Sequence, residues 1–172
     1  MIIEQFFPDE YELSAAAIDY ERLRDEGVRG IIFDIDNTLV PHDAPADEGA
    51  IALFKKLHDL GFKCLLLSNN DRERVKTFAD KVIYTDFINN AGKPGREGYE
   101  KALKRMGTGV NDTVFVGDQL FTDIFGARRT GIRSILVAKV NNREKFHIKL
   151  KRILEKPILF VYFKGRANGN KP

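Results

Sequence analysis

Residues 30–40 read GIIFDIDNTLV, and this stretch places two acidic residues directly behind an apolar run. The apolar residues predict a buried strand, and side chains two positions apart on a strand lie on the same face. Asp34 and Asp36 should therefore point the same way at the end of a buried segment, where each charge makes the other harder to ionise. Two explanations stand at this point. Either the pair belongs to a solvated turn, or a cation lies between the two carboxylates.

The overall composition is that of a soluble globular protein. Of the 172 residues, 43% are hydrophobic and 31% are charged, which excludes a disordered or fibrous chain and suits one domain over residues 1–172. The single cysteine, Cys64, allows no internal disulfide, and its apolar surroundings predict a buried structural thiol. The amino-terminal residues do not resemble a signal peptide, and no apolar stretch reaches the roughly 20 residues that span a bilayer. We therefore expect a cytoplasmic protein.

Five short apolar runs recur along the chain, separated by stretches with helical spacing. The runs are VRGIIF (28–33), FKCLLL (62–67), KVIYT (81–85), DTVFV (112–116) and RSILV (133–137). Helical spacing covers residues 46–60, 96–106 and 119–130, and a further helix is expected over 11–26. Alternating strands and helices predict parallel βαβ units, and runs that are apolar throughout predict strands covered on both faces. The expected fold is α/β, a three-layer Rossmann-like parallel sheet flanked by helices, with a core over about 28–137.

Polar residues follow four consecutive runs. Asp34 and Asp36 follow the first run, Ser68 and Asn69 follow the second, Lys93 lies in the loop after the third, and Gly117-Asp118 follows the fourth. Parallel α/β sheets bind ligands beyond the carboxyl ends of their strands, so these side chains should converge at one edge of the sheet. Each residue alone has an ordinary structural explanation. Their shared location predicts a functional site.

The motifs DIDNTLV, LLLSNN, AGKP and VGDQLFTD, in this order, resemble the four motifs of haloacid dehalogenase-type (HAD) phosphatases. The resemblance covers residues 28–137, nearly the whole predicted core. It implies the HAD-type fold and Mg²⁺-dependent hydrolysis of phosphate monoesters. Such esters resist attack because their charged oxygens repel nucleophiles, so catalysis requires charge neutralisation and in-line positioning.

The resemblance implies roles for the residues of the first motif. Asp34 would bind Mg²⁺ with one oxygen and attack phosphorus with the other, giving an aspartyl-phosphate. Asp36 would protonate the leaving oxygen and then deprotonate the attacking water, and in the family its backbone carbonyl also contacts the metal. The cation between the two carboxylates would then be Mg²⁺ with a transferring phosphoryl group. The hydroxyl of Thr38 should brace this loop by bonding to nearby backbone.

The second and third motifs supply the expected phosphate-binding groups. Ser68 resembles the hydroxyl that donates a hydrogen bond to a phosphoryl oxygen, and the amide groups at Asn69 would help. The alternative for Ser68 is the N-cap of a helix that starts near Asp71. Lys93 would be the cation that offsets charge on the phosphate and the nucleophile together, whereas a lysine in an ordinary loop is a solvated surface group.

The fourth motif completes the expected metal site, whose ligands would be Asp34, Asp36 and Asp118. Asp123 should bond a metal-bound water or Lys93, and the alternative is a favourable charge near a helix N-terminus. A site built only from oxygen atoms suits Mn²⁺ as well as Mg²⁺. The scattered histidines form no zinc motif, and the GxxxxGK[ST] and GxGxxG loops of nucleotide-binding proteins are absent.

The spacing between the motifs leaves no room for a cap domain. Only 31 residues separate Asp36 from Ser68, and 24 separate Ser68 from Lys93, enough in each case for one helix and one strand. A capless site can accept a substrate too large to enclose, or it depends on a partner as its lid. The chain resembles above all the YqeG-like group of HAD subfamily IIIA, which is similar to mitochondrial phosphatidylglycerophosphate phosphatases. The resemblance implies a lipid phosphate as substrate, with soluble esters such as nucleotides or sugar phosphates as the alternative.

The carboxyl-terminal extension, residues 139–172, is strongly basic. It holds ten Lys or Arg against two Glu, a local charge of +8, which leaves −5 for residues 1–138 out of the total of +3. Its basic residues interleave with apolar ones ahead of PILFVYF (157–163), an arrangement that suits peripheral contact with an anionic membrane at its inner face. The alternative is a last helix and strand packed on the core. Nucleic acid is not an expected partner.

Two noncatalytic functions compete with the phosphatase hypothesis. Signalling receiver domains combine Asp, Mg²⁺, a hydroxyl and Lys on an α/β fold, but their phosphorylated Asp follows the third strand. Here the third run ends at Asp86 without a matching acidic pair, and the GDxxxxD stretch has no receiver counterpart. An adaptor that has lost activity is the other alternative, and the presence of residues at all four motif positions argues against it.

Overall fold

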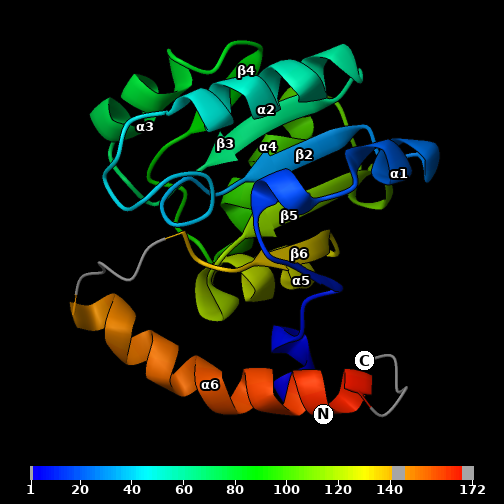
Figure 1. Ribbon diagram of the computed structural model, residues 1–172, viewed down its shortest axis with the longest axis vertical. Coiled ribbons are helices and arrows are strands. Elements are labelled where there is room, and N and C mark those ends of the chain that lie inside the picture. Colours follow the sequence, from blue (N-terminus) through cyan, green and yellow to red (C-terminus); the bar gives the residue numbers. More distant parts are fainter. Residues whose placement is uncertain (1, 141–145, 168–172) are drawn as a thin grey trace.

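The computed structural model describes residues 2–140 and 146–167 of the chain, and Figure 1 shows a central sheet with helices on both sides. Six parallel strands form this sheet in the order β1-β6-β5-β2-β3-β4. The strands are β1 (Glu10–Glu12), β2 (Gly30–Phe33), β3 (Lys63–Leu67), β4 (Thr85–Ile88), β5 (Thr113–Gly117) and β6 (Arg133–Val137). The predicted three-layer parallel fold is confirmed.

The strand order reverses at β2, which makes the carboxyl ends of β2 and β5 the topological switch point of the sheet. The chain runs outward from β2 through β3 to β4, and then returns to the other side of β2 to form β5 and β6. Phe33 at the end of β2 is paired with Val116 of β5, and the next amide, that of Asp34, donates to the Val116 carbonyl at 2.9 Å. Open α/β sheets bind ligands at such switch points, so the topology directs attention to the residues that follow these two strands.

Helices cover both faces of the sheet and enclose two apolar clusters. One face carries α1 (Tyr20–Asp25), α2 (Glu48–Asp59) and α3 (Arg72–Ala79), and the other carries α4 (Arg96–Met106) and α5 (Phe125–Thr130). Short helical turns are η1 (Ile2–Phe6), η2 (Ala15–Ala17), η3 (Val110–Asp112) and η4 (Leu120–Ile124), the last a turn of π-helix. Strand residues alternate between the clusters: Ile31 and Phe33 face the first, and Ile32 faces the second.

The segments between the first strands leave no cap domain within the described residues. The connection from β2 to β3 contains α2, and the connection from β3 to β4 contains α3. Each helix begins where an aspartate side chain accepts a backbone amide, at Asp47 for α2 and at Asp71 for α3. The carboxyl ends of β2 and β5 are therefore not covered by a domain inserted in either connection.

Two predicted elements differ from the structure. The run 81–85 is not a strand, because Lys81 and Val82 close the end of α3 through bonds to the Phe78 carbonyl and Tyr84 takes a left-handed φ of 64°. The strand that the third apolar run predicts is instead β4, which begins at Thr85, the last residue of that run. The predicted helix over 11–26 is also wrong in extent, because the edge strand β1 and the turn η2 occupy its first half and α1 begins only at Tyr20.

The described part of the carboxyl-terminal extension holds one long helix, α6 (Phe146–Ala167), and this helix occupies the region where the alternative expectation places a final strand. The helix lies along one end of the molecule beside η1 (Figure 1). Ile158 and Tyr162 are buried in a third apolar cluster with Phe7, Leu120 and other residues. Within the described residues, no helix is both long and apolar enough to cross a membrane.

Candidate active site

Lys93 and two aspartates form the buried centre of the site. The Lys93 Nζ donates hydrogen bonds of 2.7 Å to Asp34 Oδ1 and to Asp123 Oδ1. The exposed fractions of the three side chains are 3% for Lys93, 10% for Asp34 and 1% for Asp123. Asp34 follows β2, Lys93 lies between β4 and α4, and Asp123 lies in η4, so three distant segments of the chain meet at this ammonium group.

Asp118 and Thr38 lie beside this centre. The Thr38 hydroxyl is 3.2 Å from Asp34 Oδ2 and 3.3 Å from Asp118 Oδ1, and one hydroxyl proton serves only one of these oxygens at a time. The sequence predicts a bond from Thr38 to backbone, whereas its hydroxyl contacts these carboxylates. Oxygen atoms of Asp34, Asp118 and Asp123 lie within 4.8 Å of one another, and all three residues are buried.

Burial and neighbouring charges act in opposite directions on the pKa of Asp34. Burial raises this pKa from its ordinary value to about 6, the Lys93 ammonium opposes the rise, and the negative charge of Asp123 adds to it. Burial by itself lowers the pKa of Lys93, but the carboxylates of Asp123 and Asp34 raise it above its ordinary value overall. Lys93 therefore keeps its positive charge. The Asp34 carboxylate beside it is still harder to ionise than an exposed aspartate, so further positive charge would stabilise its ionised form.

The donor set fits a hard divalent cation. Asp34, Asp118 and Asp123 with Lys93 amount to three carboxylates and one ammonium, a formal charge of −2 in a buried place. Buried like charges are costly unless a cation joins them, and carboxylate oxygens are the donors that Mg²⁺ and Mn²⁺ prefer. One oxygen of Asp34 and one oxygen of Asp118 both lie near the Thr38 hydroxyl, so these two carboxylates are close together.

Asp123 is engaged by protein donors on both of its oxygens. Its Oδ1 accepts from Lys93, and its Oδ2 accepts from the Gln119 amide at 3.1 Å. The sequence suggests either a metal-bound water or Lys93 as the partner of Asp123. In the structure, the Asp123 carboxylate accepts a hydrogen bond from Lys93. We take Asp34 and Asp118 as the carboxylates best placed to hold a metal, with Asp123 as the residue that orients Lys93.

Two glycines allow this arrangement to pack so closely. A Cβ atom on Gly117, the last residue of β5, would lie 2.6 Å from the Cβ of Asp123, so a larger residue would displace that side chain. A Cβ atom on Gly126 of α5 would lie 2.4 Å from the hydroxyl oxygen of Tyr99. Tyr99 in turn donates a 2.8 Å bond to the Thr122 carbonyl, which fixes the turn that carries Asp123.

Ser68 and Asn69 follow β3, at the same edge of the sheet. Ser68 is buried, and its Oγ accepts the Asn70 amide at 3.2 Å. The Asn69 side chain donates to the Lys93 carbonyl at 3.0 Å and accepts from the Lys93 amide at 2.8 Å, so it holds the backbone of the lysine. The alternative role of Ser68 as a helix cap is wrong, because Asp71 caps α3.

The carboxylate of Asp36 lies outside the cluster formed by the other aspartates. Its Oδ1 accepts a 2.7 Å bond from Arg74 Nη2 and a 3.0 Å bond from the Asp43 amide, and its Oδ2 accepts from the side-chain amide of Asn70. The His42 ring, with its side chain 14% exposed, lies 3.6 Å from the same Oδ2. The Asp36 carboxylate is therefore part of a cluster of polar side chains at the rim of the site.

The backbone after β2 explains why Asp34 and Asp36 turn to different partners. The expectation that both carboxylates point the same way assumes that the strand continues through them. β2 ends at Phe33, and the chain then turns, with Asn37 at a left-handed φ of 65°. The strand alternation therefore no longer applies at Asp36.

Three residues near the site carry no recognisable signal in the sequence. Arg74 lies in the charged helical segment DRER, where a solvated side chain is the ordinary expectation. Asn70 is the last residue of the LLLSNN motif but has no expected role in its chemistry, and Tyr99 has the spacing of an apolar helix residue. Their contacts with Asp36 and with the turn of Asp123 depend on the tertiary fold, so no local pattern predicts them.

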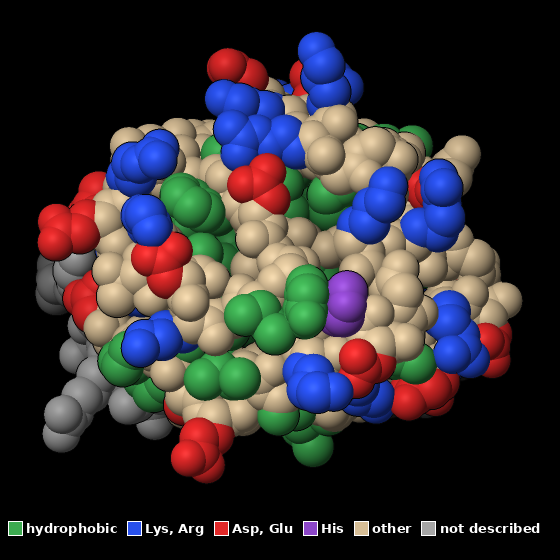
Figure 2. Space-filling view, turned by 90° about the horizontal axis from the view of Figure 1, so that it is seen from above, with side chains coloured by type: hydrophobic (Ala, Val, Ile, Leu, Met, Phe, Trp, Pro, Cys, Tyr) green, Lys and Arg blue, Asp and Glu red, His purple; other side chains and the backbone are tan. Residues whose placement is uncertain are grey.

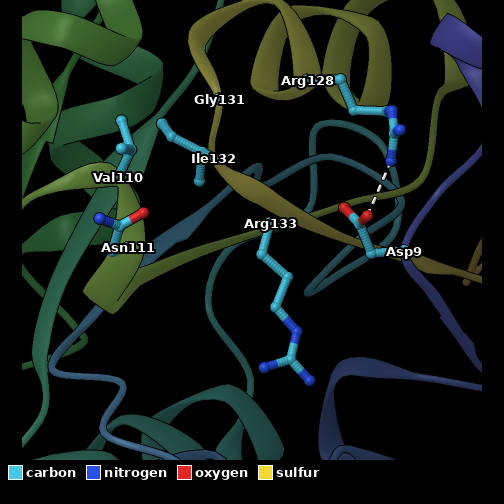
Figure 3. Close-up of a pocket in the computed structure, with 7 residues that line it drawn as sticks. All are labelled: Asp9, Val110, Asn111, Arg128, Gly131, Ile132 and Arg133. Atoms are coloured by element: carbon cyan, nitrogen blue, oxygen red, sulfur yellow. Dashed lines mark hydrogen bonds and ion pairs between the residues drawn. The ribbon is translucent and has the colours of Figure 1, made fainter.

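A cavity of about 380 Å³ lies at the amino ends of β5 and β6, opposite the edge that carries the aspartates (Figure 3). Its arginines are already paired with carboxylates. Arg128 contacts Asp9 at 2.7 Å, and Arg133 contacts Glu10 and Glu26. These ion pairs connect β1 to the body of the sheet, so we assign them a structural role.

Comparisons with known proteins agree with the geometry of the site. A family model of haloacid dehalogenase-like hydrolases matches residues 42–131. The chain is 37% identical over 160 residues to "Probable phosphatase YqeG" of Bacillus subtilis. The matched region covers 92% of this chain and 92% of that protein. It is 28% identical over 155 residues to "Phosphatidylglycerophosphate phosphatase 1, chloroplastic/mitochondrial" of Arabidopsis thaliana, covering 83% of this chain and less than half, 44%, of that protein.

The fold is similar to that of solved phosphatase structures. One is the deoxy-D-mannose-octulosonate 8-phosphate phosphatase YrbI of Haemophilus influenzae, with a TM-score of 0.52 and 15% sequence identity. The similarity covers 81% of this chain and 91% of that protein. At this level of identity, the likeness concerns the fold.

Proposed function

Because this chain belongs to the haloacid dehalogenase-like hydrolases and acts as a phosphatase of that family, we propose that it hydrolyses phosphate monoesters through a covalent phosphoryl group on Asp34, with Mg²⁺ as cofactor. The observation that carries this proposal is the contact of one buried ammonium, Lys93, with two carboxylates beside a third. Such a cluster is costly to bury, and it supplies the nucleophile and the positive charge that phosphoryl transfer requires.

In the first half of the reaction, one carboxylate oxygen of Asp34 forms a bond to phosphorus as the bond to the leaving oxygen breaks. Lys93 neutralises charge on the nucleophile and on the phosphoryl oxygens, while the Ser68 hydroxyl and the amide groups at Asn69 bind those oxygens. Asp36 supplies a proton to the leaving oxygen. To do so, its side chain must rotate from Arg74 toward Asp34.

In the second half, Asp36 takes a proton from water, whose oxygen attacks phosphorus as the bond to Asp34 breaks. Phosphate leaves and the Asp34 carboxylate is restored. Asp34, Asp118 and the backbone carbonyl of Asp36 would hold Mg²⁺, which when bound supplies positive charge for the phosphoryl oxygens. Asp123 keeps Lys93 oriented throughout.

The first experiment measures phosphate release from a panel of esters by the wild type and by Asp34→Asn, with Mg²⁺ and with a chelator. We expect release that requires Mg²⁺ and that Asp34→Asn abolishes while its circular dichroism spectrum stays native. Asp59→Asn is a matched control, because Asp59 is an exposed residue of α2 whose carboxylate pairs with Lys55. Substantial turnover by Asp34→Asn would show that the nucleophile is a different residue.

A lipid phosphate is the substrate class that the molecule suits best. The site has no cap within the described residues, and one relative is named for phosphatidylglycerophosphate. The outer side of α6 exposes large apolar side chains, with Phe160 at 67% and Ile153 at 58%, and it also carries the exposed Lys156 and Lys164. Apolar groups flanked by lysines suit the surface of an anionic membrane.

The opposite side of the molecule carries side chains of all kinds. Figure 2 views the protein from the side away from α6, and there acidic, basic and hydrophobic side chains are interspersed on the surface. The apolar and basic character of α6 therefore gives the protein one end suited to an anionic membrane. We propose peripheral attachment at the inner face of a membrane through this end.

The lipid proposal is tested by Mg²⁺-dependent phosphate release from phosphatidylglycerophosphate in mixed micelles, compared with soluble esters. We expect faster release from the lipid, and co-sedimentation of the protein with vesicles containing phosphatidylglycerol but not with phosphatidylcholine vesicles. Phe160→Ser should weaken the vesicle binding while turnover of a soluble ester stays unchanged. Brisk turnover of soluble nucleotides or sugar phosphates without turnover of the lipid would remove the proposal and favour a soluble substrate.

A further inference from the structure

The turn that follows Asp118 requires hydrogen-bond partners for its first amides. η4 begins at Leu120, and the first amides of any helical segment have no acceptor within that segment. The Gln119 amide is accepted by Asp123, a residue of the turn itself. The next amide, that of Leu120, is accepted at 2.8 Å by Oε1 of Glu155, a residue of α6.

Glu155 is a buried acidic residue for which the phosphatase mechanism has no use. It is 2% exposed, although it lies on a helix whose outer side faces solvent. Burying a carboxylate is costly, and a hydrogen bond from a backbone amide offsets part of that cost. A glutamate that served only to attach α6 would be replaceable by an apolar residue such as its neighbour on the same face, Ile158.

We propose that Glu155 is a positioning residue, which fixes the turn between Asp118 and Asp123 and so makes α6 a support of the active site. The proposal rests on the phosphatase function. Asp118 precedes Gln119 directly and Asp123 lies within η4, so a shift of the Leu120 amide moves both carboxylates. Asp123 in turn holds Lys93 against Asp34. Displacements of about 1 Å in such a group lower turnover strongly, because they act on groups that stabilise the transition state.

This coupling gives the carboxyl-terminal helix a role in regulation of the site. A displacement of α6 that carries Glu155 away from the Leu120 amide removes the acceptor that holds this turn. In the lipid-bound state proposed above, the outer face of α6 contacts the membrane while its inner face holds the catalytic turn. Attachment and catalysis would then be linked through one side chain.

Three variants separate positioning from simple packing. Glu155→Leu keeps the approximate volume and removes the acceptor, whereas Glu155→Gln keeps a carbonyl oxygen in place of the carboxylate. Ile158→Ala is the matched control, because it removes one apolar contact of α6 with the same cluster while Tyr162 still packs there and the Glu155 acceptor is kept. Purified full-length proteins are compared for kcat, KM and thermal stability on a soluble phosphate ester.

We expect Glu155→Leu to lower kcat by about 10- to 100-fold with little change in KM, because the lost bond supports transition-state groups. Glu155→Gln should keep kcat within about threefold of the wild type, since an acceptor remains. Ile158→Ala should lower the melting temperature and leave kcat near that of the wild type. If Ile158→Ala and Glu155→Leu reduce kcat equally, or if Glu155→Leu has wild-type kcat, the proposal is wrong.

Hydrogen exchange of the Leu120 amide provides a second readout that does not depend on activity. In the metal-free protein this amide should be protected in the wild type, in Glu155→Gln and in Ile158→Ala, and should exchange faster in Glu155→Leu. Unchanged protection in Glu155→Leu would contradict the proposal even if the wild type hydrolysed no phosphate ester. A wild type without activity but with the expected exchange pattern would instead count against the proposed function alone.

Discussion

The buried charges around Lys93 give the resting site an unfavourable electrostatic state. One ammonium faces three carboxylates, and the pKa of Asp34 is raised to about 6, first because it is buried. The ionised Asp34 carboxylate therefore reduces the stability of the metal-free fold at neutral pH. In our proposal, the same negative charge attracts a divalent cation and prepares an oxygen for attack on phosphorus.

Asp34→Asn should stabilise the metal-free protein at pH 8. Between pH 4 and 6 the unfolded state loses the proton of Asp34 while the folded state keeps it, so this group lowers the free energy of unfolding as pH rises. Removing the charge should gain about 1–3 kcal/mol at pH 8 and almost nothing at pH 4. Urea unfolding in the presence of a chelator measures both values. A loss of stability at pH 8 would contradict this account of the site.

Lys93→Met should have the opposite effect. The substitution leaves Asp34 and Asp123 buried without their cation, and breaking such a pair costs about 3–5 kcal/mol. Adding Asp123→Asn to the same protein should recover part of the loss, since one of the two buried charges disappears. Lys104→Met, at an exposed position of α4, is the control and should unfold like the wild type.

The sequence predicts the residues that meet at the site better than it predicts their contacts. Asp34, Lys93 and Asp118 are placed by the rule that ligands bind at the carboxyl ends of parallel strands. The same rule does not predict the direction in which each side chain points. Asp36 turns toward Arg74, and the acceptor for Leu120 comes from a helix 35 residues away in the chain. Such contacts are set by tertiary packing and leave no periodic signal.

Among the elements, the buried strands follow from the sequence and the edges do not. Runs such as RSILV are apolar because both faces are covered, and β6 occupies that predicted run in full. The edge strand β1 is only partly buried and three residues long, so its sequence, EYE, lacks this pattern. The run 81–85 has the composition of a strand, but the close of α3 and the conformation of Tyr84 decide its structure.

The burial of β3 between β2 and β4 predicts the chemistry of its cysteine. Burial raises the pKa of the Cys64 thiol to about 12, so the nucleophilic thiolate is scarce at neutral pH. We expect almost no reaction with Ellman's reagent at pH 8 in the native protein and complete reaction in guanidinium chloride. Fast labelling of the native protein would show that β3 is more accessible than the structure indicates.

The same thiol should reduce stability in alkali. In an unfolded chain a cysteine thiol ionises at about pH 8.5. In the folded protein the Cys64 thiol keeps its proton to about pH 12. The unfolded state therefore binds fewer protons in this range, and the free energy of unfolding falls as pH rises. Cys64→Ala should flatten this dependence between pH 9 and 11, and an unchanged slope would assign it to other groups, such as the buried Tyr20.

At the scale of the whole molecule, charge and shape divide the protein into two parts. Residues 1–138 carry a formal charge of −5 and contain the site, whereas residues 139–172 carry +8 and supply α6. A basic segment attached to an acidic body orients the protein toward an anionic surface. Because Glu155 connects that segment to the catalytic turn, the two parts are one functional unit in our proposal.

The central claim is that Asp34 carries the phosphoryl group during turnover, and trapping that group tests it most directly. Wild-type protein is mixed with Mg²⁺ and a phosphate ester that it hydrolyses, quenched within one turnover, and treated with borohydride, which reduces an acyl phosphate to an alcohol. We expect mass spectrometry of the peptides to find homoserine at position 34, and no such product with Asp34→Asn or without ester. Reduction at a different residue, or efficient turnover with residue 34 unmodified, would contradict the account.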